Sequence, residues 1–117
     1  EHMKRVAGIC KLISQSGILT IASVASLKEE SREYARKILN KMLLVYLQCP
    51  LEVCEKRDVK GHYKKSKENA GGFENFKVSY NFEEPKNPDV ILNTDKESPE
   101  ESVKKLLEVL EKKGIIN

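Results

Sequence analysis

The sequence predicts an α/β fold built on a parallel sheet, and two observations support this prediction. Short apolar segments that suit buried strands alternate with longer segments in which apolar residues recur at helical spacing. Signals that begin or end helices separate these segments, and no internal repeat is visible. Strands that alternate with helices imply right-handed crossovers, so we expect the strands to lie parallel in one sheet.

The first third of the chain predicts two helices around one strand. Apolar residues at helical spacing between Met3 and Ile13 indicate a first helix, and Gly17 follows as its stop. Residues 18–24 are apolar and rich in β-branched side chains, so they predict a buried strand. Lys28 to Leu39 predicts a second helix. Its inward-facing residues should be Tyr34, Ala35, Ile38 and Leu39.

The remaining strands and helices follow the same alternation. Residues 43–47 predict a second buried strand, a one-turn helical segment LEVCEK follows Pro50, and residues 90–92 predict a short third strand. The last helix opens at Ser98 with proline at its first helical position and a capping box to Glu101, and Gly114 ends it. Its apolar face should consist of Val103, Leu106, Leu107 and Leu110.

A basic run follows the second predicted strand. Between residues 56 and 67 only one acid, Asp58, faces six cations. The whole connection from 58 to 89 is polar, holds glycines and prolines, and lacks apolar periodicity, and connections this long are usually functional or disordered. A strand that delivers a cationic loop to its carboxyl end can cover phosphates. The cations are Lys56, Arg57, Lys60, Lys64, Lys65 and Lys67.

Composition indicates one domain with a modest core. The chain has 117 residues, of which 39% are hydrophobic and 33% are charged, and this balance is typical of a folded, surface-rich protein. The net charge of +3 is too small to argue for nucleic acid. The longest apolar run is far short of a membrane span and no signal segment opens the chain, which favours the cytoplasm.

The cysteines are predicted to be free thiols. Cys10, Cys49 and Cys54 are odd in number and form no C-x-x-C pair, and free cysteines are usually buried. A zinc site would need more ligands than two histidines and scattered cysteines supply.

Four segments together resemble the adenylylsulfate kinase family. CPLEVCEKRDVKGHYKK at 49–65 is the most specific of them. EHMKRVAGICKLISQS at 1–16, IASVASLKEESREYAR at 21–36 and NPDVILNTD at 87–95 match family stretches in the same order. The resemblance implies a P-loop nucleoside-triphosphate kinase-like three-layer sandwich with a parallel sheet.

One family motif is absent from the sequence. The G-x-x-x-x-G-K-[ST] pattern, whose amides, lysine and hydroxyl hold the triphosphate and magnesium, occurs nowhere in the chain. We therefore interpret residues 1–117 as a single partial kinase domain, its carboxyl-terminal part, with the amino-terminal strand and phosphate loop missing.

The resemblance also implies a reaction. It is the transfer of the ATP γ-phosphate to the 3′-hydroxyl of adenylylsulfate, which gives 3′-phosphoadenylylsulfate, with Mg²⁺ bridging the ATP phosphates. Residues 58–89 would then form a lid over ATP and a loop that holds adenylylsulfate. The expected partner is this small molecule rather than nucleic acid or membrane, and a homodimer is compatible with the resemblance.

On the ATP side, the resemblance assigns four cations. Arg57 would contact the base of ATP, Lys64 would bind ATP, and Lys60 and Lys65 would be catalytic lid cations, because lysine is a mobile point charge. The alternatives are a surface turn at Arg57–Asp58 and a solvated basic loop.

On the acceptor side, the resemblance assigns an aromatic and a serine. Phe76, an aromatic in a polar glycine-rich loop, would stack on the adenine of adenylylsulfate. A hydrophobic anchor is its alternative role, and Phe73 is the alternative residue. Ser26 follows a predicted strand and matches the serine of the family's active-site S-P motif, although Leu27 replaces the proline, so the resemblance implies a catalytic role for it. A helix cap or turn serine is the alternative there.

Three basic residues match basic residues of the family and are predicted to bind the substrate. Lys4 and Arg5 match its paired basic residues, and Arg32 matches the arginine of its D-R pair. Lys4, Arg5 and Arg32 could meet sulfate or phosphate, or could form surface salt bridges instead. Acidic Glu29 replaces a family arginine, and the family's TGIDSP segment is largely absent at 77–82. Two rivals therefore stay open: an inactive remnant that binds a nucleotide or a partner, and a nucleotide kinase with another acceptor. Two further departures are His2 for asparagine and Ser31 for aspartate.

Overall fold

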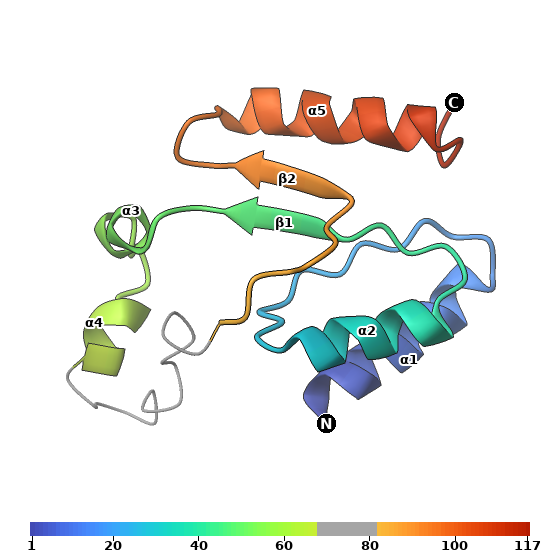
Figure 1. The fold of residues 1–117 in the computed structure, drawn as a ribbon, viewed down its shortest axis with the longest axis horizontal. Helices are drawn as coiled ribbons and strands as arrows, with labels where there is room; N and C mark the ends of the chain where they lie inside the picture. The colour runs from blue at the N-terminus through green and yellow to red at the C-terminus, as the bar shows by residue number, and fades with distance from the viewer. Residues whose placement is uncertain (68–81) are drawn as a thin grey trace. The chain divides into compact units, whose positions relative to one another are not determined.

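The structure is a computed structural model of the chain, and it describes residues 1–67 and 82–117, with the backbone alone at 65–67. These residues form five helices and two strands in the order α1, α2, β1, α3, α4, β2, α5 (Figure 1). The chain divides into two compact units. The first comprises residues 1–42 and 78–86, and the second comprises residues 43–77 and 87–117.

The first unit contains the two predicted amino-terminal helices. Helix α1 spans His2–Ser14 and α2 spans Glu29–Ile38, so both predictions are confirmed within one or two residues. The helices pack through two small buried side chains, Ala7 and Ala35, with exposed fractions of 3% and 8%. Gly17, just beyond α1, has φ +81°, a backbone conformation that favours glycine, as expected for its stop.

The predicted strand at residues 18–24 is wrong. The segment has no regular secondary structure, and its apolar side chains lie exposed, with Ile21 at 87% and Ile18 at 59%. A strand requires a neighbour whose backbone accepts and donates its ladder hydrogen bonds. In the described part of the chain, the strands that pair are β1 and β2. β-Branched composition alone could not reveal that missing partner.

The second unit is built on a two-stranded parallel sheet, which confirms the predicted strand orientation. Strand β1 spans Val45–Gln48 and β2 spans Val90–Asn93, with Val45 opposite Val90 and Gln48 opposite Asn93. Val90 and Leu92 are buried and α5 packs along β2, as Figure 1 shows. The second predicted strand is shifted toward the carboxyl end, and its Leu47 is exposed rather than buried.

Asp89 joins the starts of the two strands to the last helix. Its backbone N–H donates to the Leu44 carbonyl at 2.9 Å, and its carboxylate accepts from the Leu44 N–H at 2.7 Å. The other carboxylate oxygen accepts from Lys113 at 3.4 Å. In the sequence, Asp89 stands out only as part of the NPDVILNTD segment.

Helix α5, Pro99–Lys112, begins and ends as predicted. The Ser98 hydroxyl accepts from the Glu101 N–H at 3.2 Å, while the Glu101 carboxylate accepts from the Ser98 N–H at 2.9 Å, which completes a capping box. Pro99 occupies the first helical position, and Gly114 follows with φ +68°.

Two short helices follow β1. The predicted one-turn helix is present as α3, Leu51–Lys56. Helix α4, His62–Lys67, lies within the connection for which the sequence predicted no regular structure. Two local features mark its start. Gly61, the residue before the helix, has φ +66°, and the carboxylate of Asp58 accepts a hydrogen bond from the Lys64 N–H in the first helical turn at 3.2 Å. Apolar periodicity cannot detect a six-residue helix of this kind.

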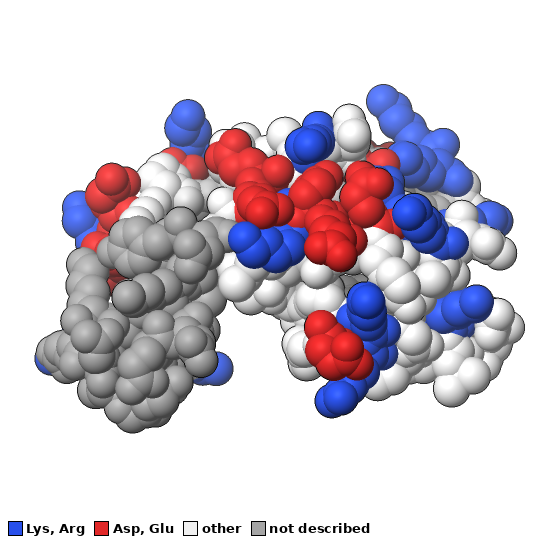
Figure 2. Space-filling model, turned by 60° about the horizontal axis from the view of Figure 1, so that its bottom comes forward, with Lys and Arg blue, Asp and Glu red and all other residues white. Residues whose placement is uncertain are grey.

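Charged side chains of both signs lie close together on the face in Figure 2. Among the described residues, no helix combines the length and apolarity needed to cross a bilayer.

Candidate active site

The carboxyl ends of β1 and β2 lie at one edge of the sheet and carry the predicted nucleotide residue Arg57. The Thr94 N–H, just past β2, donates to the Gln48 carbonyl at 3.1 Å and extends the ladder. Arg57, at the end of α3, donates from Nη1 to the Thr94 carbonyl at 3.0 Å. Ligands of open α/β sheets bind beyond this edge. The structure therefore holds an exposed guanidinium at this edge of the sheet.

Glu97 shapes the turn that presents the Thr94 carbonyl. Its carboxylate accepts from the Asn93 N–H at 3.4 Å, from Lys105 at 3.2 Å and from the Ser102 hydroxyl at 3.4 Å. Desolvation raises the pKa of Glu97, but these hydrogen bonds together outweigh it and leave the pKa lowered. Sequence reasoning missed Glu97, and its only signal was an acid just before the capping box.

The predicted lid lysines lie on and beside α4. Lys60 and Lys64 are exposed, and the Lys65 side chain lies outside the described residues. A hollow of about 430 Å³ adjoins Lys64. Because three carboxylates share its wall with two lysines, the hollow by itself does not suit a triphosphate. Its lining residues are Glu52, Glu55, Lys56, Asp58, Tyr63 and Lys64.

The three cysteines are free and half-buried, so the prediction of free thiols is confirmed and that of full burial is not. The Cys54 thiol points to the Cys49 carbonyl at 3.9 Å. Burial, and then the neighbouring Cys49 thiol, raise the pKa of Cys54, which keeps it protonated and a poor nucleophile. Cys54 therefore does not suit thiolate chemistry.

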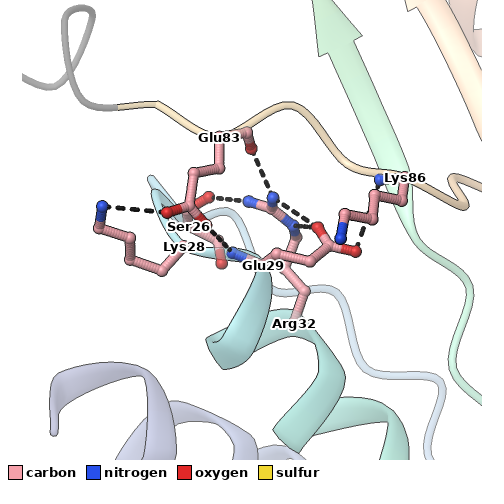
Figure 3. A network of polar contacts seen from close by, with 6 residues as sticks. All are labelled: Ser26, Lys28, Glu29, Arg32, Glu83 and Lys86. Carbon is pink, nitrogen blue, oxygen red and sulfur yellow. Dashed lines mark hydrogen bonds and ion pairs between the residues drawn. The ribbon is translucent and has the colours of Figure 1, made fainter.

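In the first unit, the structure brings Ser26 and Arg32 together (Figure 3). Arg32 is only 4% exposed, and its Nε and Nη2 donate to one Glu29 carboxylate oxygen at 2.9 and 2.7 Å. Nη1 donates to the Ser26 carbonyl, and Nη2 also donates to the Glu83 carbonyl. The Phe82 ring centroid lies 5.6 Å from the guanidinium carbon. The Arg32 guanidinium, which was predicted to bind the substrate, thus donates four hydrogen bonds within the protein.

Glu83 is the residue of this cluster that sequence reasoning missed. One carboxylate oxygen accepts from the Glu29 N–H at 2.8 Å and the other accepts from Lys28 at 3.1 Å. The Glu83 N–H donates to the Leu27 carbonyl at 2.9 Å. The hydrogen bond from the Glu29 N–H, and then the one from Lys28, lower the pKa of Glu83. A contact across more than fifty residues leaves no signal in local sequence.

The Ser26 hydroxyl oxygen is buried and has no hydrogen-bond partner among the described residues. A buried hydroxyl without a partner is costly, so its position invites a functional explanation. It is the one polar side-chain atom in the described part of the chain with this property.

The predicted acceptor residues on α1, Lys4 and Arg5, contact other side chains of that unit. Lys4 lies over the Tyr34 ring with its nitrogen 5.4 Å from the centroid, and Arg5 approaches Glu1 at 4.0 Å on the exposed side of α1. Phe76 and its alternative Phe73 lie outside the described residues. The roles of all three assigned residues, Lys4, Arg5 and Phe76, stay predictions.

Comparisons with known proteins agree on one family. The family model described as adenylylsulphate kinase matches residues 1–93. The adenylyl-sulfate kinase of Halothermothrix orenii is 46% identical over all of this chain and 63% of its own length. That of Bacteroides thetaiotaomicron is 45% identical over 94% of this chain and 55% of its own. The crystal structure of APE1195 matches with a TM-score of 0.80 at 30% identity, covering 95% of this chain and 64% of that one.

These matches place the chain first in the P-loop kinase-like α/β fold class, which confirms the predicted fold class. The chain belongs, more narrowly, to the adenylylsulfate kinase family. It spans between about half and two thirds of the length of these relatives.

Proposed function

We propose that this chain supplies the lid and acceptor side of an adenylylsulfate kinase, which transfers the ATP γ-phosphate to the 3′-hydroxyl of adenylylsulfate. One observation carries the proposal. The family's most specific segment, CPLEVCEKRD, places Arg57 at the carboxyl edge of a parallel sheet, bonded to the Thr94 carbonyl. That edge is where such folds bind nucleotides.

Phosphoryl transfer depends on positioning and charge neutralisation, and this chain's residues suit both tasks. Arg57 would stack on the base of ATP, and the lysines at 60, 64 and 65 would approach its phosphates. Phe76, Lys4 and Arg5 would hold adenylylsulfate, and Ser26 would lie at the reacting end.

Magnesium is assigned to the ATP phosphates rather than to ligands of this chain. Among the described residues no cluster of three or more histidine, cysteine or acidic side chains could hold a metal ion. A cytoplasmic location and a homodimer stay predictions.

A chimera tests the proposal. The matching segment of the Halothermothrix orenii relative is replaced by this chain, and ATP-dependent formation of 3′-phosphoadenylylsulfate is measured. We expect activity within about ten-fold of the parent, because family residues at 46% identity should preserve the positioning. A folded chimera that binds ATP but phosphorylates nothing would contradict the proposal.

A different acceptor is the second candidate. Glu29, which replaces a family arginine, contacts Arg32 directly, so the cation expected to meet sulfate already faces a carboxylate. A screen of the chimera with nucleotides other than adenylylsulfate separates the two candidates. Faster turnover of another acceptor would favour the second.

A further inference from the structure

We propose that Arg32 is a positioning residue rather than a ligand for the acceptor's sulfate: with Glu83 it forms a clip that fixes the backbone from Ser26 to Glu29 at the start of α2. The clip comprises Arg32, Glu29 and Glu83. The inference deepens the proposed function, since it concerns how Ser26 is held, but the contacts that carry it are independent of any reaction.

The first argument is the charge around Arg32. The guanidinium is 4% exposed and meets the Glu29 carboxylate through two donors, at 2.9 and 2.7 Å. The hydrogen bond from Arg32 is the largest of the effects that lower the pKa of Glu29, which keeps that carboxylate ionised. A sulfate would have to displace Glu29 and leave its charge beside the incoming anion. Arg32 is therefore poorly placed to bind a second anion.

The second argument is the incomplete cap of α2. The residue before the helix, Lys28, carries no side-chain acceptor and makes no side-chain capping bond. The Glu83 carboxylate performs this task from a distant segment, because it accepts from the N–H of Glu29, the first helical residue, at 2.8 Å. A carboxylate at a helix N-terminus is also favoured by the helix dipole.

The third argument is that the clip is reciprocal. The Glu83 side chain caps α2, while Arg32, on the first turn of α2, donates back to the Glu83 carbonyl. The Glu83 N–H donates to the Leu27 carbonyl at 2.9 Å, so side chain, carbonyl and amide are all engaged. Figure 3 shows the guanidinium between Glu29 and the carbonyls of Ser26 and Glu83.

The clip acts on Ser26 through its carbonyl. Arg32 Nη1 donates to that carbonyl, and the Ser26 N–H donates to the Val24 carbonyl at 3.1 Å. The backbone of Ser26 is thus held on both sides while its buried hydroxyl stays unpaired among the described residues. The clip therefore fixes the backbone that carries this hydroxyl.

Amide hydrogen exchange on the 117-residue chain tests the clip without any activity. In Glu83→Ala, and in Arg32→Ala, exchange at the Glu29 amide should rise roughly ten-fold or more, and exchange at the Ser26 amide should rise with it. Glu83→Gln, which keeps an acceptor, should show a smaller rise. Glu30→Gln, which removes a charge from the same helical turn, is the matched control and should leave both amides unchanged.

Exchange that is unchanged in both alanine variants would overturn the clip. If an alanine variant unfolds, the same two amides are compared in Glu83→Gln and Lys28→Ala, which perturb the clip less. Retained protection at Leu92 in the second unit serves as the check on folding.

Kinetics of the chimera separate positioning from sulfate binding. A clip predicts that Glu83→Ala and Arg32→Ala lower kcat by similar factors, with the KM for adenylylsulfate within about two-fold, and that Arg32→Lys recovers part of kcat. A sulfate ligand predicts that Arg32→Ala raises this KM while Glu83→Ala does not, which would overturn the inference. An inactive parent chimera would contradict the proposed function alone, because the exchange experiment still decides the clip.

Discussion

At the scale of single residues, the carboxylates of Glu29 and Glu83 take their properties from what they contact. Arg32 lowers the pKa of Glu29, and the Glu29 N–H together with Lys28 lowers the pKa of Glu83. Each carboxylate is thus bonded more strongly in the folded chain than in the unfolded chain. Folding stability should therefore depend on pH in the acid range.

The sign of that dependence follows from the direction of the shifts. A carboxyl group whose folded pKa is lowered stabilises the fold above its ordinary pKa of 4.5, and the stabilisation is lost as the pH falls from there through the folded pKa. We expect the free energy of unfolding to fall in this window, and to fall less in Glu83→Gln, which cannot ionise. Urea unfolding at a series of pH values measures both. Glu30→Gln is the control and should show the same pH dependence of the free energy of unfolding as the unchanged chain. A Glu83→Gln variant with that same pH dependence would contradict a role for the Glu83 carboxylate.

A second residue-scale prediction concerns Phe76, which lies outside the described residues. In the chimera, Phe76→Ala should raise the KM for adenylylsulfate roughly ten-fold, as loss of one stacking contact on a base implies, and leave the KM for ATP nearly unchanged. Phe73→Ala is the control for a shifted loop. Equal rises for both substrates would show that Phe76 anchors the loop instead.

At the scale of elements, local signals predicted four of the five described helices, missed α4, and predicted the strands less well. The capping box of α5 was predicted to the residue, because Ser98, Pro99 and Glu101 act within one turn. The strand at 18–24 failed, since a strand depends on a partner that its own sequence does not reveal.

The residues of the candidate site were also predictable only in part. Arg57 could be identified because a specific run of residues carries it. Glu83 and Glu97 could not, because they act through backbone groups brought near by folding. Arg32 was identified as important, but burial and its contact with Glu29 are tertiary facts that no spacing shows.

The α5 cap gives a quantitative prediction. Ser98→Ala removes the acceptor of the Glu101 N–H and should lower the free energy of unfolding by about 1 kcal/mol, as typical N-cap losses do. Ser98→Thr keeps a hydroxyl and should cost less. Urea unfolding followed by circular dichroism measures both variants. Equal losses would indicate that packing, and not the hydrogen bond, sets the effect.

Asp89 should contribute more to folding stability than its partly exposed ion pair with Lys113 alone would suggest. Asp89→Ala leaves the half-buried Leu44 N–H without its carboxylate acceptor, so we expect a loss of about 1–3 kcal/mol in the free energy of unfolding. Lys113→Ala removes only the contact at 3.4 Å and should cost less than about 1 kcal/mol. The same urea titration compares them. A Lys113 variant as damaging as the Asp89 variant would assign the stability to the ion pair.

At the scale of the whole molecule, little apolar surface is fully buried. Ala7, Ala35, Val90 and Leu92 are the buried apolar residues of the described chain. Several larger side chains are exposed instead, among them Leu12 at 70% and Leu47 at 62%. Apolar side chains that are exposed singly are normal on protein surfaces, so these residues do not by themselves define an interface. The residues assigned to chemistry thus lie on two units, each with a small core of its own.

The last prediction concerns what this chain does by itself. The purified 117-residue chain should not transfer phosphate from ATP at an enzymic rate, because its sequence has no G-x-x-x-x-G-K-[ST] pattern. Without that nest of amides, its lysine and its hydroxyl, nothing aligns the γ-phosphate for in-line attack, however well Arg57 and the lid lysines neutralise charge. A coupled assay with ATP and adenylylsulfate measures the rate, with the chimera as positive control. Robust turnover by the chain that Arg57→Ala abolishes would show that phosphate binding is achieved by other residues of this sequence.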